Sequence, residues 1–465
     1  MLSKRKIHFE ISERKILLRI FDVIVVLFLL NMMSQYLDFD YFSISRKNFY
    51  WPLVLGIYII IFGTVFEMYN LQVASNQFQV IRSIVLTSST TCLFYMLTPF
   101  FSPFLPLNRL QIIYFFCGVF FGLLFWRIFY QRYLGSYRFE KKVILVCEQD
   151  QLSKLVSDIE NIDPHYKIIG YINTATHQDE PKQFRNVMRL TAEDTDVFIR
   201  KNYVSEIVIA SQKMHTGITI PLYNTLLGLL QFGITIREYS HVYEYLTQRI
   251  PIHRFDKDFY EYFPFSRNNQ NELYLLIVKL NEYFFAFIGL LGCGIIIPFI
   301  FIGNLIGNKG TLFYTQERIG KNGVVFKIYK FRTMIKNAEK DQAVFSNVND
   351  IRVTPFGKFL RKTRLDETPQ FINILKGDMG FIGPRPERPF FVNQITSEMP
   401  FYKVRHVMKP GLTGWAQVNY SYGESIEDSL IKLQYDLYYI KHRGIFIDIN
   451  VILRTLSTVL FYRGQ

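Results

Sequence analysis

The stretch YFFAFIGLLGCGIIIPFIFIGNLIG at residues 283–307 decides how the second half of this chain meets a membrane. Its length and apolar composition suit a helix that crosses the hydrocarbon core, which takes about 20 residues. Two features favour instead a helix that enters one leaflet and returns. Pro298 lies inside the stretch, where proline removes a backbone hydrogen bond and kinks a helix. The basic residues that follow are typical of a cytoplasmic segment and comprise Lys309, Arg318, Lys321, Lys327, Lys330 and Arg332. We therefore expect a re-entrant membrane helix over residues 283–307.

Four further apolar segments lie upstream, at residues 16–37, 50–68, 80–98 and 110–130. Each has about 20 residues, the length of a transmembrane helix. Lysine and arginine cluster around the start of the first segment and after the fourth, which predicts that both ends of the bundle are cytoplasmic. We expect a four-helix transmembrane bundle over residues 1–135. The polar start of the chain, with no small-residue cleavage site after the first apolar run, predicts no cleavable signal peptide.

The pattern changes to short strands and amphipathic helices over residues 138–262. Strands are predicted at KKVILVC, YKIIGYI, SEIVIAS and GITIREY, and helices near residues 152–159 and 221–232. Alternating strands and helices predict a parallel sheet with helices on its faces, as in a Rossmann-like domain. The turn after the first strand reads CEQDQ and has no glycine, so the backbone cannot approach a pyrophosphate as it does in dinucleotide-binding folds. We interpret this domain as structural or regulatory.

Composition excludes several classes of protein. The chain has 465 residues, of which 49% are hydrophobic and 17% aromatic, so it is neither disordered nor of low complexity. Its net charge of +14 suits anionic partners, such as nucleic acid, anionic lipid or a nucleotide-linked substrate. The four cysteines form no CxxC motif and the eight histidines show no metal-binding spacing, which argues against a zinc site.

Residues 310–414 contain a mixture of side chains typical of phosphate chemistry. Asp366 and Glu367 are adjacent carboxylates in a strongly basic segment, and Arg385 lies between two prolines that stiffen its backbone. Neighbours on a helix point about 100° apart, so the two carboxylates would take different tasks. One carboxylate can attack phosphorus, and the other can hold Mg²⁺ bound to substrate phosphates. The simpler alternative is a charged helix start, where acidic residues are favoured.

A basic set surrounds this carboxylate pair. A guanidinium group can bind two phosphate oxygens at once, so the arginines are candidates for phosphate recognition. Glycines at positions 377, 380 and 383 would let backbone N–H groups approach a phosphate as well. The alternative for the set is a solvated face or a surface for anionic lipid. Aromatic residues have no regular spacing here, so nucleic acid is not indicated. The set comprises Lys330, Arg332, Lys358, Arg361, Lys362, Arg364, Lys376, Arg385 and Arg388.

Several segments resemble, in order and in spacing, the bacterial sugar transferase family, whose members are polyisoprenyl-phosphate hexose-1-phosphate transferases, or monotopic phosphoglycosyl transferases. The resemblance covers residues 272–465 and is carried by KFRTM, RLDETPQ, NILKGDMGFIGPRPERP, PGLTGWAQVN and KLQYDLYYIK. The upstream helices and Rossmann-like module resemble the large branch of the family, which starts exopolysaccharide, capsule or O-antigen synthesis. The expected fold is therefore a membrane α-helical bundle, an α/β Rossmann-like domain and a mostly α catalytic domain with a re-entrant membrane helix.

The resemblance implies a role for each matching residue. Asp366 would be the nucleophile, and Glu367 would assist it and contact Mg²⁺, with Asp366 as a second candidate ligand of the metal. Pro298 matches the proline that kinks the re-entrant helix of the family. The residues expected to bind substrate phosphate are Lys330, Arg332, Arg361 and Arg385.

The implied reaction has two steps. Asp366 attacks the β-phosphorus of a UDP-sugar and UMP leaves, and polyprenyl (undecaprenyl) phosphate then attacks the aspartyl-phosphosugar. The expected location is the cytoplasmic face of a bacterial inner membrane, in contact with the phospholipid bilayer. The sugar, the polyprenyl length, a ligand for the middle domain and a homodimer all stay open. Two other functions are considered: a glycosyltransferase that releases UDP, and a membrane scaffold without enzymatic activity.

The chain departs from the family pattern at three places. The segment before the re-entrant helix, where the family is often rich in Lys and Arg and has an Asp, reads VKLNEYF. Gly380 stands where the family commonly has Ser, and Thr368 stands where it commonly has a larger apolar residue. These departures bear on sugar preference, on local packing and on how the helix base is anchored, more than on the reaction.

Overall fold

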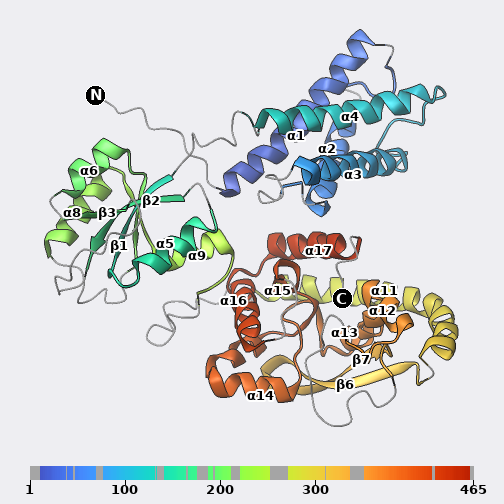
Figure 1. Cartoon of the computed structure of the whole chain (residues 1–465). Helices are drawn as coiled ribbons and strands as arrows, with labels where there is room; N and C mark the ends of the chain where they lie inside the picture. Colours follow the sequence, from blue (N-terminus) through green and yellow to red (C-terminus); the bar gives the residue numbers. More distant parts are fainter. Residues whose placement is uncertain are drawn as a thin grey trace. The chain divides into compact units, whose positions relative to one another are not determined.

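The structure is a computed structural model in which the chain divides into two compact units, Met1–Thr247 and Gln248–Gln465. It is mostly helical, with several apolar helices and a five-stranded parallel sheet (Figure 1). The described residues are all except 1–10, 38, 45–47, 67, 70–76, 131, 133–140, 164–165, 175–186, 192–193, 211–219, 252–270, 309, 336–349, 421–424 and 461–465. The second unit begins at Gln248, so it includes part of the segment that the sequence assigns to the middle domain.

Four apolar helices of the first unit coincide with the four predicted segments. They are α1 (Ile11–Tyr36), α2 (Tyr50–Val65), α3 (Gln77–Met96) and α4 (Leu110–Phe129). Residues 16–36 of α1 and all of α4 are long and apolar enough to cross a membrane. Helix α2 has 16 residues, and the apolar part of α3, Val80–Met96, is also shorter than a full span. At 1.5 Å per residue α2 extends about 24 Å, less than the hydrocarbon thickness of about 30 Å.

Polar side chains of these helices are turned into the bundle. Thr87 and Ser88, from the polar run TSSTT of α3, are fully buried, and the Ser88 hydroxyl donates to the Ile84 carbonyl oxygen at 2.8 Å. Asp22 of α1 and Arg127 of α4 form a buried ion pair with an N–O distance of 2.8 Å. Burial beside a partner is the arrangement in which charges are tolerated inside apolar helix bundles.

A five-stranded parallel sheet with strand order β3-β2-β1-β4-β5 forms the rest of the first unit. This confirms the predicted parallel sheet, and the order is that of a Rossmann-like half. Helices α5 (Leu152–Glu160) and α9 (Tyr239–Thr247) lie on one face, and α6 (Thr195–Asn202) and α8 (Ile220–Gln231) lie on the other (Figure 1). The strands are β1 (Lys141–Cys147), β2 (Tyr166–Asn173), β3 (Met188–Leu190), β4 (Glu206–Ile209) and β5 (Thr235–Glu238).

Buried charge in this sheet lies at the amino ends of the strands, away from the edge where such folds bind ligands. Glu206 is fully buried, forms an ion pair with Lys141 and accepts a hydrogen bond from the Tyr166 hydroxyl at 3.2 Å. The chain leaves β1 through residues 148–151 without a glycine. The segments that follow β2 and β4, residues 175–186 and 211–219, lie outside the described residues.

We expect this sheet to bind neither NAD⁺ nor ATP, because the turn after β1 has no glycine that lets the backbone approach a pyrophosphate. Calorimetric titration of the detergent-solubilised protein should show no heat of binding, whereas a dinucleotide-binding Rossmann protein in the same detergent provides the positive control. A dissociation constant in the micromolar range for either nucleotide would refute this expectation.

In the described part of the second unit, a long helix comes first and is followed by a helical body with two small sheets. The long helix is α11 (Glu272–Gly307), of 36 residues. Antiparallel β6 and β7 form one sheet, and parallel β8 and β9 form the other. The remaining elements are β6 (Phe313–Ile319), β7 (Val325–Phe331), α12 (Pro355–Lys362), the 3₁₀ helix η8 (Leu365–Gln370), α13 (Phe371–Lys376), β8 (Gly380–Ile382), α14 (Pro389–Glu398), η9 (Pro400–Val407), β9 (Gly411–Thr413), α15 (Trp415–Asn419), α16 (Ile426–His442) and α17 (Ile445–Leu460).

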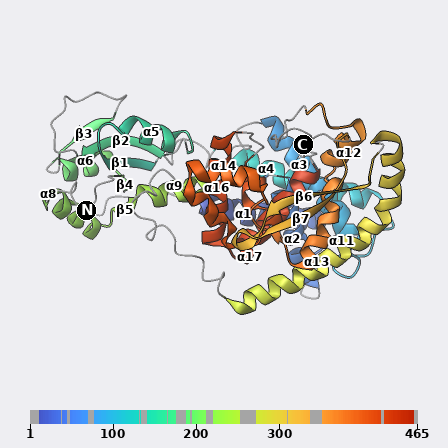
Figure 2. The same ribbon diagram turned by 90° about the horizontal axis from the view of Figure 1, so that it is seen from below.

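Helix α11 contains the predicted kink residue Pro298 but starts earlier than the apolar stretch. Asn271 caps it, because its side-chain oxygen accepts a hydrogen bond from the Tyr274 N–H at 3.1 Å. The ribbon changes direction in the C-terminal part of the helix (Figure 2). The sequence pattern missed the first turns because residues 272–282 mix charged and apolar residues.

Both ends of α11 are hydrogen-bonded to the body of the second unit. Near its start, the Tyr274 hydroxyl donates to Asp448 of α17 at 2.6 Å. At its end, the Asn308 side-chain amide donates to the Arg332 carbonyl oxygen at 2.7 Å. Between these points, Phe371 of α13 packs against Gly289, where an added Cβ would come closer than 3.0 Å to the ring. The helix therefore stays in contact with one body from beginning to end.

Candidate active site

Asp366 and Glu367 lie in η8, between α12 and α13, and both are buried with 7% of their surface exposed. The chain enters η8 through Arg364, whose φ of 58° is in the left-handed region that non-glycine residues seldom adopt. Such a conformation costs on the order of 1–3 kcal/mol and is concentrated at functional sites. It turns the chain sharply, so that η8 presents both carboxylates to the interior.

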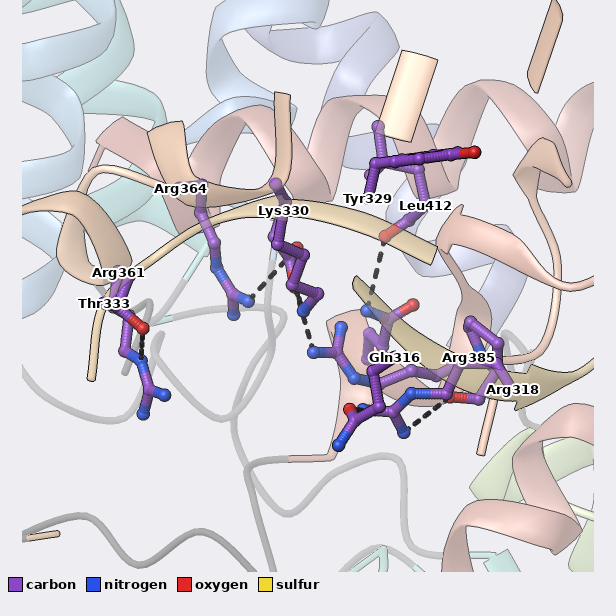
Figure 3. Close-up of polar contacts among 12 residues, drawn as sticks. Gln316, Arg318, Tyr329, Lys330, Thr333, Arg361, Arg364, Arg385 and Leu412 are labelled. Atoms are coloured by element: carbon purple, nitrogen blue, oxygen red, sulfur yellow. Dashed lines mark hydrogen bonds and ion pairs between the residues drawn. The ribbon is translucent and has the colours of Figure 1, made fainter. Parts of the chain in front are cut away.

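Three cationic side chains converge on Glu367 (Figure 3). Lys330 Nζ and Arg385 Nη2 lie 2.8 and 3.0 Å from its Oε1. Arg364 Nη1 lies 3.7 Å from its Oε2. These residues come from β7, from the loop before α14 and from the residue that starts η8, so the carboxylate ties three separate segments together.

The two carboxylates differ in charge state for a physical reason. Burial raises the pKa of Glu367, but the charges of Lys330, Arg385 and Arg364 outweigh burial and hold that pKa well below its usual range. Burial and the adjacent charge of Glu367 raise the pKa of Asp366 to about 6. Within the described part of the chain, Asp366 Oδ1 is buried and has no hydrogen-bond partner. Asp366 is thus ionised at neutral pH and has an oxygen available for a ligand.

A buried asparagine holds the strand that carries Lys330. The Asn373 side chain, on α13, accepts from the Tyr329 N–H at 3.1 Å and donates to the Lys327 carbonyl oxygen at 2.7 Å. It is fully buried. Because these contacts lie on β7 immediately before Lys330, they fix the strand that directs its ammonium group toward η8.

The backbone around Arg385 is held by an unbroken series of hydrogen bonds. The four consecutive carbonyl oxygens of residues 384–387 each accept one bond from a distant segment. A loop fixed in this way keeps the Arg385 guanidinium pre-aimed at Glu367. The donors are the Gly411 N–H at 3.0 Å, Arg405 Nη2 at 3.0 Å, Arg318 Nη1 at 3.1 Å and the Ile319 N–H at 2.9 Å.

A second buried ion pair supports this loop. Arg405, which donates to the Arg385 carbonyl oxygen, also pairs with Asp436 of α16 at 2.7 Å. Both side chains are almost fully buried. Burial raises the pKa of Asp436 to about 6, against the opposing charge of Arg405. The Asp436 carboxylate balances the charge of the Arg405 guanidinium, so Arg405 can lie in the core and hydrogen-bond to the loop.

The other two predicted phosphate-binding residues have threonine partners instead. Arg361 Nε donates to Thr333 Oγ1 at 3.0 Å, and Figure 3 shows this pair to one side of the convergence at Lys330 and Arg385. Arg361 still acts on Asp366 through its charge, which lowers that pKa. Arg332 donates to the backbone and hydroxyl oxygens of Thr311 at 3.0 and 2.6 Å. The structure therefore brings Lys330 and Arg385 to the carboxylates and engages Arg332 elsewhere.

The glycines of this region do not present free N–H groups as the sequence suggested. The N–H groups of Gly377, Gly380 and Gly383 donate to the carbonyl oxygens of Ile374, Pro410 and Thr413, at 3.0, 2.8 and 2.9 Å. These three N–H groups are therefore engaged within the protein. At Gly383 the requirement is close approach, because an added Cβ would clash with the backbone of residues 409–411.

A magnesium ion fits the donor set only together with substrate oxygens. Among the described residues there is no group of three or more His, Cys, Asp and Glu side chains that could hold a metal. Mg²⁺ commonly takes one or two carboxylates and completes its shell with phosphate oxygens and water. Asp366 Oδ1 has no partner in the described chain, and Glu367 Oε2 has its ion pair at 3.7 Å, so the two residues could supply such ligands.

Sequence reasoning did not single out Arg405, Asp436 or Asn373. For Asp436 a signal exists, because it shares a helical face with Leu433, Leu437 and Ile440 in the stretch KLQYDLYYIK, and a charge on an apolar face requires a partner. For Arg405 and Asn373 the partners lie too far along the chain for any local pattern to reveal.

We expect Asp436→Asn to destabilise the protein by about 3–5 kcal/mol, because it leaves the Arg405 guanidinium buried without its counter-charge. Thermal unfolding of the detergent-solubilised protein measures the loss. Glu427→Gln, at the exposed first turn of the same helix, is the matched control and should cost less than about 1 kcal/mol. Equal melting temperatures for Asp436→Asn and Glu427→Gln would show that the buried pair does not stabilise the fold.

Comparison with known proteins locates this site within a family. The profile of the family described as "Bacterial sugar transferase" matches residues 273–462, which include η8, β7 and the Arg385 loop. A UDP-N-acetylgalactosamine-undecaprenyl-phosphate N-acetylgalactosaminephosphotransferase of Aeromonas hydrophila is 47% identical over 153 residues, which are 33% of this chain and 36% of that protein. The chain thus matches about a third of the length of this relative.

Two further relatives extend the coverage. A shorter Bacillus subtilis protein, provisionally named an undecaprenyl-phosphate N-acetylgalactosaminyl 1-phosphate transferase, is 44% identical over 144 residues, which are 30% of this chain and 79% of that protein. The galactosyl transferase CpsE of Streptococcus agalactiae is 29% identical over 357 residues, which are 72% of this chain and 76% of that protein. That match is longer than the second unit, so the likeness extends into the first. On the profile match and on these coverages, the chain belongs to the bacterial sugar transferase family.

Proposed function

We propose that this protein transfers a sugar-1-phosphate from a UDP-sugar to polyprenyl phosphate, through a covalent intermediate on Asp366. The observation that carries the proposal is the buried carboxylate pair of η8. One carboxylate is neutralised by cations, and one oxygen of the other has no partner among the residues that the structure describes. The family relatives support the reaction class, since their names specify undecaprenyl-phosphate sugar-phosphate transfer.

Asp366 is the better nucleophile of the pair. Glu367 has Oε1 bound by two cations and Oε2 paired with a third, which withdraws negative charge from it. Asp366 has an unpartnered oxygen, and its pKa of about 6 makes it more basic than an ordinary carboxylate while leaving it ionised at neutral pH. The different partners of the two carboxylates thus support Asp366 as the attacking residue, a choice that their adjacent places in the sequence leave open.

In the first step, Asp366 Oδ1 forms a bond to the β-phosphorus, and the bond from that phosphorus to the bridging oxygen breaks. UMP leaves with the bonding electron pair, and the sugar phosphate is then joined to Asp366 as an acyl phosphate. In the second step, a phosphate oxygen of polyprenyl phosphate attacks the same phosphorus and returns the electron pair to the carboxylate. The product is polyprenyl-diphosphate-sugar, and the enzyme is unchanged.

The cations around Glu367 supply electrostatic stabilisation. Lys330 and Arg385 are already oriented before substrate arrives, so little reorganisation is needed when charge develops on the phosphoryl oxygens. Arg361, whose charge reaches Asp366, is placed to contribute as well. Mg²⁺ held by Asp366 and Glu367 would neutralise further charge on the diphosphate.

The packing of α11 supports a re-entrant arrangement in the bilayer. A straight helix of 36 residues would extend about 54 Å, so ends held on opposite sides of a membrane could not both contact one compact body. Here Tyr274 and Asn308, near the two ends, both bind that body. The outward side chains of α11 are apolar and exposed, among them Leu276, Phe284, Ile295 and Phe299. They would face lipid.

An amphipathic helix next to this one would add to membrane contact. Helix α17 exposes an apolar stripe and buries its other face, with Val451 fully buried. A helix of this kind lies in the interface between headgroups and acyl chains. Together with the apolar helices of the first unit, this stripe supports our proposal that the protein lies in a bacterial inner membrane with its active site on the cytoplasmic face. The exposed stripe comprises Ile445, Phe446, Ile449, Ile452 and Leu456.

The topology is tested by single cysteines at positions 271 and 317, which are exposed on either side of α11, in a variant that lacks the four native cysteines. Both should react with a membrane-impermeant maleimide in inside-out vesicles and stay unlabelled in intact spheroplasts. Position 108, in an expected outer loop, is the control that should show the reverse pattern. Labelling of 271 and 317 from opposite sides would show that α11 spans the membrane.

The chemistry is tested with Asp366→Asn in membrane fractions supplied with a panel of UDP-sugars. UMP release should fall at least a thousandfold, and the wild type should trap a phosphosugar on Asp366 when polyprenyl phosphate is omitted. Asp196→Asn, an exposed carboxylate of the first unit, is the matched control and should keep full activity. UDP as the product would favour a glycosyltransferase, and an active Asp366→Asn would remove the proposed nucleophile.

A further inference from the structure

Glu282, in the middle of α11, reaches from the membrane helix into the sheet that leads to Arg385. Its Oε1 accepts a hydrogen bond from the Phe381 N–H of β8 at 3.2 Å. The Phe381 ring then packs against Phe285 of the same helix, at a centroid distance of 6.4 Å. A polar contact and an aromatic contact therefore join α11 to β8 at one point.

The residue beside this contact is a glycine for a steric reason. A Cβ added to Gly380 would lie less than 3.0 Å from Glu282 Oε1 and 3.4 Å from Cδ, and its three nearest atoms all belong to Glu282. Gly380 does not have a positive φ, so its backbone conformation is open to other residues. Its N–H donates to the Pro410 carbonyl oxygen, which any residue except proline could do. Any side chain at position 380 would therefore require the Glu282 carboxylate to move from its hydrogen bond with the Phe381 N–H.

The two partners are also two places where the sequence departs from its family pattern. Glu282 lies in the segment VKLNEYF, and Gly380 replaces a common serine. These positions are 98 residues apart in the sequence, yet the structure places them in direct contact. The Glu282 carboxylate lies where a side chain at position 380 would begin.

The position of β8 bears directly on the active site. Strand β8 pairs with β9 through Gly380 and Ile382, and the chain then runs without a break into residues 383–387. Arg385, in that run, contacts Glu367 at 3.0 Å. Glu282 therefore acts on the Arg385 loop from the membrane side, whereas Arg405 holds it from the core.

We propose that Glu282 is a positioning residue, matched in size to Gly380, that sets the place of the Arg385 loop relative to the membrane helix. This inference rests on the proposed function only where activity is its readout. If the two residues are matched in size, a change at either one should disturb the loop less when the other residue is changed as well.

The test is a double-mutant cycle on the full-length protein in membranes. Gly380→Ser should lower the rate of UMP release at least tenfold, because the new Cβ displaces the Glu282 carboxylate. Glu282→Asp alone should lose a few-fold, and adding it to Gly380→Ser should recover at least threefold, because the shorter side chain clears the serine. Gly292→Ser is the matched control on the same helix, since an added Cβ there meets nothing within 4 Å.

Hydrogen exchange of the peptide that contains Phe381 gives a readout that needs no activity. Gly380→Ser and Glu282→Ala should each speed exchange at this amide at least tenfold, and Glu282→Asp added to Gly380→Ser should slow it again. If the wild type releases no UMP, the proposed function fails, and exchange alone decides the positioning role. Wild-type exchange in Gly380→Ser, or a double variant no better than the single one by rate and by exchange, overturns the inference.

Discussion

The structure of the second unit depends on one buried carboxylate. Glu367 is almost out of contact with water, and Lys330, Arg364 and Arg385 surround it. Without its charge, three cations would converge on a poorly solvated point and repel each other. With it, a β-hairpin, a 3₁₀ helix and a proline-flanked loop are held at one place. The site thus needs Glu367 for assembly before any substrate arrives.

Further buried contacts extend outward from this centre. The Arg385 carbonyl oxygen is bound by Arg405, which is itself paired with Asp436 in the core. The same loop is reached from α11 through Glu282 and Phe381. A buried charge pair is worth little for stability by itself, but losing one member is costly. Such pairs therefore suit a loop that must be held in one position, even where they add little to the stability of the fold.

How much the sequence predicted depends on the range over which its signals act. The four apolar segments and strands β1, β2, β4 and β5 follow from hydrophobic patterns within about ten residues, and these were found. Strand β3 has three residues, two of them exposed, so it has no such pattern. The carboxylate pair and Arg385 were found because they are unusual locally. Two other pairs were not found: Arg405 with Asp436, and Glu282 with Gly380. Each of these residues has no unusual feature in the local sequence, and only the fold places it beside its partner.

The two adjacent carboxylates show the same limit of sequence-based prediction, because their different environments cannot be read from the dipeptide itself. By sequence, Asp366 and Glu367 differ by one methylene and share a neighbourhood. The fold gives Glu367 three cationic partners and leaves Asp366 with a free buried oxygen, so their pKa values move in opposite directions. With Arg361 nearby, the cations around the pair outnumber the two carboxylates. Surplus positive charge at a buried site favours the entry of an anion, and the diphosphate of the proposed substrate would bring that charge.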